Sequence, residues 1–186
     1  MVFPIPLPGE LRREGVLLRA LDDADWQLEY DLSRVPDVPQ WTYYPPDMDE
    51  VSARRRISRT MERHEQGLAD RYAVVIDGAV VGTAGMASIE GASPEVFYVL
   101  KPDGRGRGAA TASVRLLAEW LLAHGYLTVA LETIAGNTAS ERVAQRAGFR
   151  CTESHPGTQR QRPVQLNRWV LEAQQPTLSE AESSNA

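Results

Sequence analysis

Residues 95–111 read EVFYVLKPDGRGRGAAT, and this stretch decides how the whole chain is interpreted. The β-branched and aromatic residues between Glu95 and Leu100 predict a strand that stops at Pro102. A glycine-rich segment follows, and beyond it apolar residues recur with helical spacing as far as His124. The stretch therefore predicts a strand, a glycine-rich loop and a helix in direct succession.

The glycine-rich loop is suited to binding an anion. A helix N-terminus carries unpaired N–H groups and the positive end of the helix dipole. Gly106 and Gly108 have no Cβ atom, so a phosphate group can approach the backbone closely. Arg105 and Arg107 can add charge-assisted hydrogen bonds. The loop lacks the residues of a nucleoside-triphosphate or dinucleotide motif, and a plain connection with solvated arginines is the alternative.

Working outward from this loop, the sequence predicts a mixed α/β (α+β) domain. The clearest hairpin signal is Asp77-Gly78, which separates two β-rich runs. The predicted order is a strand at 16–19, a helix from about 22, a proline-rich loop at 35–47, a helix from about 47 to 67, strands at 71–76, 79–86 and 95–100, a helix ending near 124, a strand at 127–134, a helix at 138–147, and strands at about 149–153 and 164–171.

The length of 186 residues fits one domain. We expect a flexible arm at 1–9, one folded domain at 10–172 and a disordered tail at 173–186, because the tail lacks aromatic residues and periodicity. No apolar stretch approaches the ~18 residues of a membrane span, and the start does not resemble a secretory signal. The only cysteine, Cys151, excludes a disulfide framework and is expected to be buried.

Charge and composition narrow the function. A net charge of −5 argues against nucleic acid as the main partner. The three histidines lack metal-ligand spacing, so no metal is expected. These features predict a cytoplasmic protein that works without a membrane, a metal or a nucleic acid.

A second motif lies downstream, where Asn137-Thr-Ala-Ser140 opens a short helix that ends before Gly148-Phe149. Together with the loop, residues 95–149 closely resemble the GNAT superfamily of acetyl-CoA-dependent N-acetyltransferases. The nearest branch is that of the RimJ/RimL-type ribosomal-protein N-terminal acetyltransferases and their small-molecule relatives. The matching positions are Arg105, Gly108 and Ala110 in the first motif, and Asn137, Ser140, Gly148 and Phe149 in the second.

The resemblance implies a fold and a way of binding acetyl-CoA. It implies a mostly antiparallel central sheet flanked by helices, in which the strands at 95–100 and 127–134 splay apart. The pantetheine arm would pair with the backbone of Tyr98, Val99 and Leu100, and Asn137 would contact the arm. The pyrophosphate would lie on the backbone of Gly106, Arg107, Gly108, Ala109, Ala110 and Thr111, beside Arg105.

The resemblance also implies the chemistry, which is direct attack of a primary amine on the thioester in a ternary complex. Glu95 stands where the superfamily often places its base, although Glu132 or water alone are alternatives. Ser140 matches the position that hydrogen-bonds the departing thiolate, and its alternative role is to start a helix. Tyr98 is expected to pack or to wall the site rather than act as an acid.

Four aromatic residues are candidates for binding the acceptor. Trp41, Tyr43 and Tyr44 lie in the proline-rich loop that walls the acceptor site in this superfamily, or they cover the edge of the core. Phe97 stands where many relatives have glycine, so it narrows one face of the cleft. The acceptor is a small-molecule amine, such as a metabolite or an antibiotic, or a protein N-terminus.

A function without catalysis is the second hypothesis. A sensor or partner subunit that binds acyl-CoA would keep Arg105–Thr111 and would not need Glu95 or Ser140, because a fold alone does not determine function. The sequence leaves open whether the chain works as a monomer or as a homodimer.

Overall fold

The computed structural model describes residues 7–174. Most of the expected arm and tail, at 1–6 and 175–186, lies outside the described residues. Leu7 packs against the core, and the carbonyl of Gly9 accepts a 2.9 Å hydrogen bond from the backbone N–H of Ala20. The chain between the two termini folds around a single sheet, whereas the proposed domain limits remain a prediction.

The sheet has eight strands in the order β1-β2-β3-β4-β5-β6-β8-β7. Neighbouring strands are antiparallel except β5 and β6, which are parallel. The strands are β1 Glu10–Arg13, β2 Val16–Ala20, β3 Ala69–Ile76, β4 Ala79–Ala87, β5 Glu95–Leu100, β6 Thr128–Ile134, β7 Arg150–Gln159 and β8 Arg162–Glu172.

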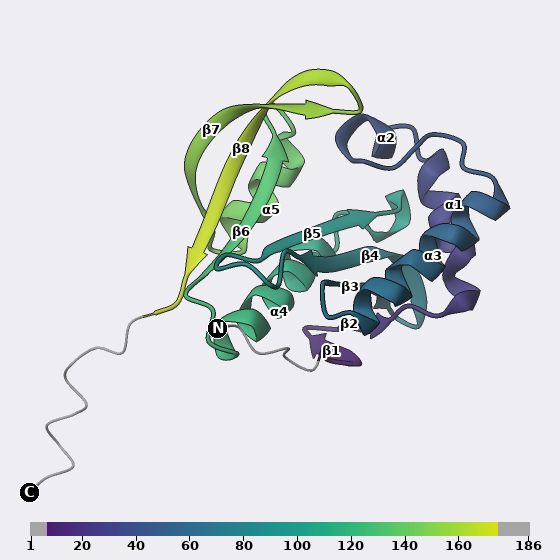
Figure 1. Cartoon of the computed structure of the whole chain (residues 1–186), viewed down its shortest axis with the longest axis horizontal. Coiled ribbons are helices and arrows are strands. Elements are labelled where there is room, and N and C mark those ends of the chain that lie inside the picture. Colours follow the sequence, from purple (N-terminus) through teal and green to yellow (C-terminus); the bar gives the residue numbers. More distant parts are fainter. Residues whose placement is uncertain (1–6, 175–186) are drawn as a thin grey trace, which may run out of the picture.

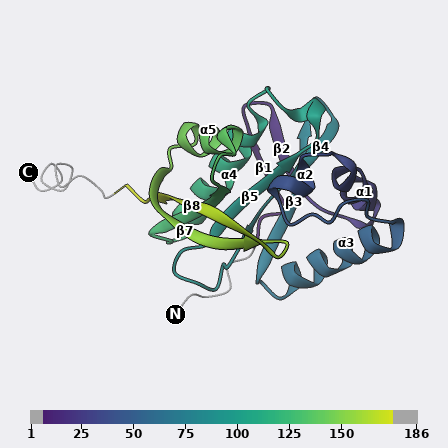
Figure 2. The same ribbon diagram turned by 90° about the horizontal axis from the view of Figure 1, so that it is seen from above.

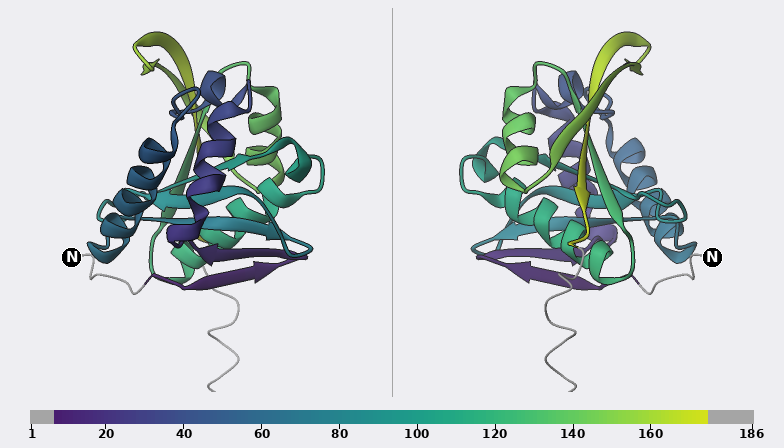
Figure 3. Two further views of the ribbon diagram at one scale, coloured as in Figure 1. Left: turned by 90° about the vertical axis from the view of Figure 1, so that its right-hand side faces the viewer. Right: turned by 90° about the vertical axis from the view of Figure 1, so that its left-hand side faces the viewer.

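Helices cover both faces of this sheet (Figures 1 and 3). One face carries α1 Trp26–Arg34, α2 Val38–Trp41 and α3 Glu50–Glu65, and the other carries α4 Ala109–Ala123 and α5 Thr138–Arg146. Each face has its own apolar cluster, one centred on α4 and one on α1 and α3. No helix in the described part of the chain is long and apolar enough to cross a membrane. The mixed, mostly antiparallel architecture expected from the sequence is confirmed.

Local chemistry explains several element boundaries. The β3–β4 turn places Asp77 at φ 50° and Gly78 at φ 79°, as a tight hairpin turn of this type requires. Asp49 caps α3 by accepting a 2.8 Å hydrogen bond from the N–H of Ser52. The carboxylate of Asp22 accepts from the N–H of Ala24 and caps the short 3-10 helix Asp23–Asp25 before α1.

The sheet opens between β5 and β6. These strands share one paired register, Glu95 with Ala130, and the N–H of Ala130 donates to the carbonyl of Pro94 at 2.8 Å. Beyond that point the two strands diverge, and β6 continues together with β8 and β7 as a separate arm of the sheet (Figures 1 and 2). The splayed strands expected from the resemblance are present.

The structure differs from the sequence-based expectation in four places. An additional strand, β1, precedes the expected first strand, and one helical turn, α2, interrupts the proline-rich loop. The last two strands are longer than expected because Pro156 and Gly157 lie within β7, at the sheet edge, where a missing N–H costs no ladder bond. Cys151 is exposed rather than buried, as are most side chains of the edge strand β7.

A buried ionic network joins α1 and α3 to β3 of the sheet. Glu29 of α1 is fully buried and accepts 2.6 Å hydrogen bonds from Arg71 of β3 and Arg56 of α3. The hydroxyl of Tyr44 donates to Glu29 at 3.1 Å, and burial raises the pKa of Tyr44 so that this proton is retained. Removing one member of such a network leaves another buried charge without a partner.

We predict that Glu29→Gln lowers the free energy of unfolding by about 3–5 kcal/mol, because Arg71 would keep its charge in a buried site. Urea denaturation measures this change. Glu50→Gln is the matched control, since the exposed Glu50–Arg54 pair on α3 should contribute no more than about 0.5 kcal/mol. Equal, small losses in the two variants would contradict the assigned role of the network.

Candidate active site

The glycine-rich loop leads directly into α4 without a side-chain cap. Gly108 is the N-cap residue in the left-handed conformation at φ 80°, and Gly106 has φ 73°. A Cβ atom added at either glycine would meet nothing within 4 Å, so the space beside the backbone is open. The first backbone hydrogen bond of α4 runs from Ala112 to Gly108. The N–H groups of Ala109, Ala110 and Thr111 therefore have no backbone acceptor in the described chain, as expected for an anion site.

Both arginines of the loop have protein partners. Arg105 forms a two-pronged ion pair with Asp37, at 2.7 and 3.0 Å, and also donates to the carbonyl of Leu100. This pairing lowers the pKa of Asp37. Arg107 forms an ion pair with Asp77 of the β3–β4 turn. The two side chains hold the loop against its neighbours and keep positive charge beside the open backbone.

The divergence of β5 and β6 exposes one backbone edge of β5. The N–H of Lys101 donates to Val81 at 2.8 Å, so the odd-numbered residues of β5 direct their backbone groups toward β4. The alternate residues Tyr98 and Leu100 direct their backbone groups toward β6, which is no longer paired with β5 at this point. The carbonyl of Leu100 is taken by Arg105, whereas the other groups of these two residues have no strand partner in the described chain.

Ser140 of α5 lies beside this gap and contacts Tyr98 of β5. Their hydroxyl oxygens are 2.9 Å apart, and burial raises the pKa of Tyr98, so the phenol stays protonated. Asn137 caps α5 by accepting a 3.2 Å hydrogen bond from the N–H of Ser140. The fold thus brings together Tyr98, Ser140 and Asn137, which are separated in the sequence but were all singled out from it.

Glu95 and Glu132 lie on the opposite face of the sheet, toward α1 and α3. Glu95 is the β5 partner of Ala130, and Glu132 follows two residues later on the same side of β6. Burial raises the pKa of the half-buried Glu95, and the charge of Glu132 raises it further. A carboxyl group with a raised pKa is suited to accepting a proton near neutral pH.

Sequence reasoning missed two partners of Glu132. Its Oε1 atom lies 3.2 Å from Nε2 of His155 on β7 and accepts a 3.4 Å hydrogen bond from Arg168 on β8. Arg168 lies directly across from Glu132 in the β6–β8 register. No local sequence pattern joins residues on three strands, and the consecutive polar residues from Thr152 to His155 show no alternation that would single out His155.

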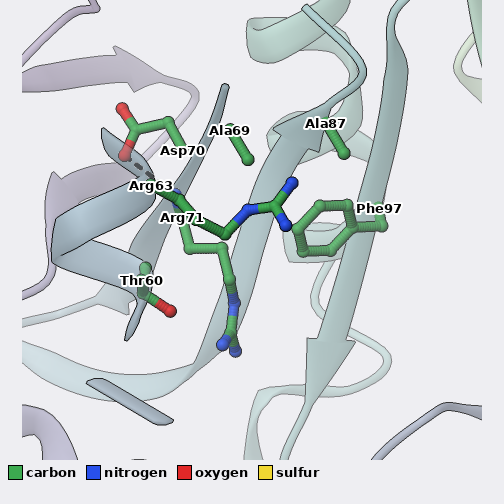
Figure 4. A pocket seen from close by; sticks show the side chains of 7 residues that line it. All are labelled: Thr60, Arg63, Ala69, Asp70, Arg71, Ala87 and Phe97. Carbon is green, nitrogen blue, oxygen red and sulfur yellow. Dashed lines mark hydrogen bonds between the residues drawn. The ribbon is translucent and has the colours of Figure 1, made fainter. Parts of the chain in front are cut away.

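Phe97 points to the same face and lines a small pocket of about 140 Å³ (Figure 4). The ring lies over Gly85, where a Cβ atom would come within 2.7 Å of it. The other lining residues are Thr60, Arg63, Ala69, Asp70, Arg71 and Ala87. The pocket therefore lies between α3, which carries Thr60 and Arg63, and β5, which carries Phe97.

The proline-rich loop contributes its aromatic residues unequally. Tyr43 is 69% exposed, and its hydroxyl reaches the carbonyl of Thr158 at 3.4 Å. Tyr44 is 2% exposed and belongs to the buried network, which fits the alternative in which it covers the core. The partly buried Trp41 ends α2, and Gln159 at the tip of the β7–β8 hairpin donates to the carbonyl of Thr42 at 2.7 Å. The loop and the hairpin tip thus meet above the sheet (Figure 1).

Among residues 7–174, no group of three or more histidine, cysteine, aspartate or glutamate side chains is arranged to hold a metal ion. The polar groups of the site are instead backbone N–H groups at the loop, two hydroxyls beside the gap, and carboxyl groups on the opposite face. This arrangement can hold an anionic group on one side and move a proton on the other.

The fold is shared with several acetyltransferases of known structure. RimL, a ribosomal L7/L12 alpha-N-protein acetyltransferase solved with coenzyme A, matches with a TM-score of 0.78 and 17% identity, over 86% of this chain and 95% of RimL. MccE, a microcin C7 self-immunity acetyltransferase solved with acetyl-CoA and AMP, matches with a TM-score of 0.79 and 14% identity, over 86% and 93%. An acetyltransferase from Bacillus anthracis matches with a TM-score of 0.78 and 17% identity, over 89% and 99%.

A search of curated protein sequences found no significant match. The acetyltransferase (GNAT) domain family matches residues 16–150, which is more than half of the chain and includes both sequence motifs. The match begins at β2 and ends at the start of β7, so it contains the loop, the gap between β5 and β6, and α5. The chain therefore belongs to the GNAT family of acetyltransferases.

Proposed function

We propose that this protein is an N-acetyltransferase that moves the acetyl group of acetyl-CoA to a primary amine by direct attack in a ternary complex. The observation that carries the proposal is the continuity between the uncapped N-terminus of α4 and the unpaired edge of β5. A coenzyme with an anionic pyrophosphate and an amide-containing arm needs both features, at adjacent positions.

The pyrophosphate would be held by the loop backbone from Gly106 to Thr111. The absence of side chains at Gly106 and Gly108 leaves room for it, and the helix dipole favours negative charge there. Arg105 and Arg107 would contribute positive charge while keeping the loop in place. The pantetheine amides would pair with the free backbone groups of Tyr98 and Leu100.

The thioester would then lie in the gap near the hydroxyls of Tyr98 and Ser140. We assign Ser140 the role of donating a hydrogen bond to the departing thiolate, with Tyr98 holding its hydroxyl in position. Asn137 supports the site by capping α5, and its amide group is left to contact the coenzyme arm.

Glu95 is our candidate for the base that removes a proton from the acceptor ammonium. Its raised pKa makes it a better proton acceptor than an ordinary glutamate, and its position at the single paired register of β5 and β6 places it where the gap begins. The amine must lose this proton before its lone pair can attack the carbonyl carbon.

The acceptor would approach from the face that carries α1–α3. Phe97 and the exposed Tyr43 are the candidates for contacting it, with Trp41 at the edge of the same loop. The names of RimL and MccE describe enzymes that act in ribosomal-protein modification and in microcin immunity. Both acceptor classes, a protein N-terminus and a small-molecule amine, therefore belong in the first screen.

We predict that Gly108→Val weakens CoA binding at least ~10-fold, because a branched side chain would project into the phosphate position. Isothermal titration calorimetry measures the dissociation constant. Gly15→Val is the matched control, since Gly15 has φ 79° and equally open surroundings but lies in the β1–β2 turn. Equal dissociation constants of the two variants for CoA would show that the loop does not bind the coenzyme.

We also predict that the protein releases CoA thiol when acetyl-CoA is combined with peptides of differing N-termini and amine antibiotics. Glu95→Gln should lower kcat by about 10²-fold at neutral pH with unchanged CoA affinity, because it removes the base. For the unmodified protein, kcat/KM should fall as the pH decreases through the raised pKa of Glu95.

Glu119→Gln is the control for this measurement, because Glu119 forms an exposed ion pair with Arg13 far from the gap. Full turnover by Glu95→Gln would transfer the role of base to Glu132 or to water. CoA binding without thiol release from any amine would favour the non-catalytic alternative.

A further inference from the structure

Acetylation of a protonated amine leaves one proton to be removed from the site. An alkylammonium ion and acetyl-CoA give an amide, CoA thiol and one proton, whereas a neutral amine gives the amide and the thiol alone. The thiolate takes one proton in both cases. A base that is half-buried, such as Glu95, must therefore return its proton to solvent before the next turnover.

We propose that Glu132 and His155 form a relay that carries this proton from Glu95 to solvent, with Arg168 positioning the carboxylate of Glu132. This inference rests on the proposed function and deepens it. The relay gives His155 a role, although the sequence around it suggests neither a metal site nor a nucleophile.

The geometry of the three side chains supports the relay. Glu132 lies between Glu95 on one side and His155 on the other, and its Oε1 atom is 3.2 Å from Nε2 of His155. The side chain of Glu132 is 25% exposed and that of His155 is 37% exposed, so access to water increases along the path. Arg168, at 3.4 Å, holds the carboxylate from the neighbouring strand.

Both nitrogens of the His155 ring face acceptors. Nδ1 lies 3.3 Å from the carbonyl of Pro156, and Nε2 faces the carboxylate. These contacts and the nearby charge of Glu153 raise the pKa of His155. Two acidic groups act on the ring, Glu132 from β6 and Glu153 from its own strand. The cation nearest to this pair is Arg168 of β8, which is bound to the carboxylate of Glu132.

Each step of the relay conserves the proton. The ammonium N–H bond breaks and Glu95 becomes a carboxylic acid, which passes its proton through an intervening water molecule to the carboxylate of Glu132. Glu132 passes the proton to the free Nε2 of neutral His155, whose Nδ1–H donates to Pro156, and an imidazolium forms. The imidazolium loses a proton to water, and exchange with solvent restores the starting tautomer.

The choice of amine distinguishes this relay from a structural role. Ethylamine is protonated near neutral pH and requires net release of a proton, whereas hydroxylamine is neutral and does not. We expect His155→Gln to lower acetyl transfer to ethylamine at least ~10-fold, as for loss of a proton-transfer group, and to change transfer to hydroxylamine less than ~2-fold. His124→Gln, on the exposed end of α4, is the matched control and should change neither rate.

An NMR titration of the imidazole resonances tests the coupling without any acceptor. The pKa of His155 should lie above that of an ordinary histidine and should fall in Glu132→Gln, whereas Glu119→Gln should leave it unchanged. An unshifted pKa in Glu132→Gln, or equal loss of rate with both amines, would overturn the relay.

The failure of the proposed function would look different. In that case the unmodified protein would not bind acetyl-CoA in the calorimeter, or would transfer acetyl to neither amine, whatever the state of His155. That result would overturn the catalytic use of the relay together with the proposed function. Loss of the relay alone leaves CoA affinity and hydroxylamine acetylation intact.

Discussion

The separation of β5 from β6 after one paired register is the constraint on which the rest of the structure depends. A sheet strand that loses its neighbour keeps backbone N–H and C=O groups that must find other partners. Here the carbonyl of Leu100 is satisfied by Arg105, which also binds Asp37, and the remaining backbone groups of Tyr98 and Leu100 have no strand partner in the described part of the chain. The same divergence brings α5 beside β5, so that Ser140 meets Tyr98. One topological feature thus creates both the unpaired strand edge and the hydroxyl pair next to it.

In the proposed function, the two faces of the sheet have different roles. The face with α4 and α5 carries the uncapped helix N-terminus and the hydroxyls, which suit an anionic coenzyme and a departing thiolate. The face with α1–α3 carries Glu95 and Glu132, where a proton can be accepted and passed on. The network around Glu29 fastens α1 and α3 to β3, on the face from which the acceptor is proposed to approach.

Much of the fold could be predicted because its boundaries depend on local chemistry. Asp77-Gly78, Pro102 and Asn137 act within a few residues, so their turns and caps are visible in the sequence. The anion-binding loop could be proposed from its glycines and the helix that follows it, whereas the roles of Tyr98, Leu100 and Asn137 came from the resemblance to the GNAT superfamily. His155 and Arg168 could not be found, because their contact with Glu132 depends on the register of three strands. Because of Pro156 and Gly157, the predicted strand ends near 153, whereas β7 continues to Gln159. The burial of Tyr44 depends on Glu29 and Arg71, which are distant from it in the sequence.

Amide hydrogen exchange with and without acetyl-CoA tests the central claim most directly, because it reports on individual backbone N–H groups. The account predicts that acetyl-CoA slows exchange at Leu100 and Tyr98 and along the loop from Gly106 to Thr111. Exchange in β1 and β2, on the far side of the sheet, should not change. Protection confined to other strands, or saturating acetyl-CoA with no protection at β5 and the loop, would contradict it.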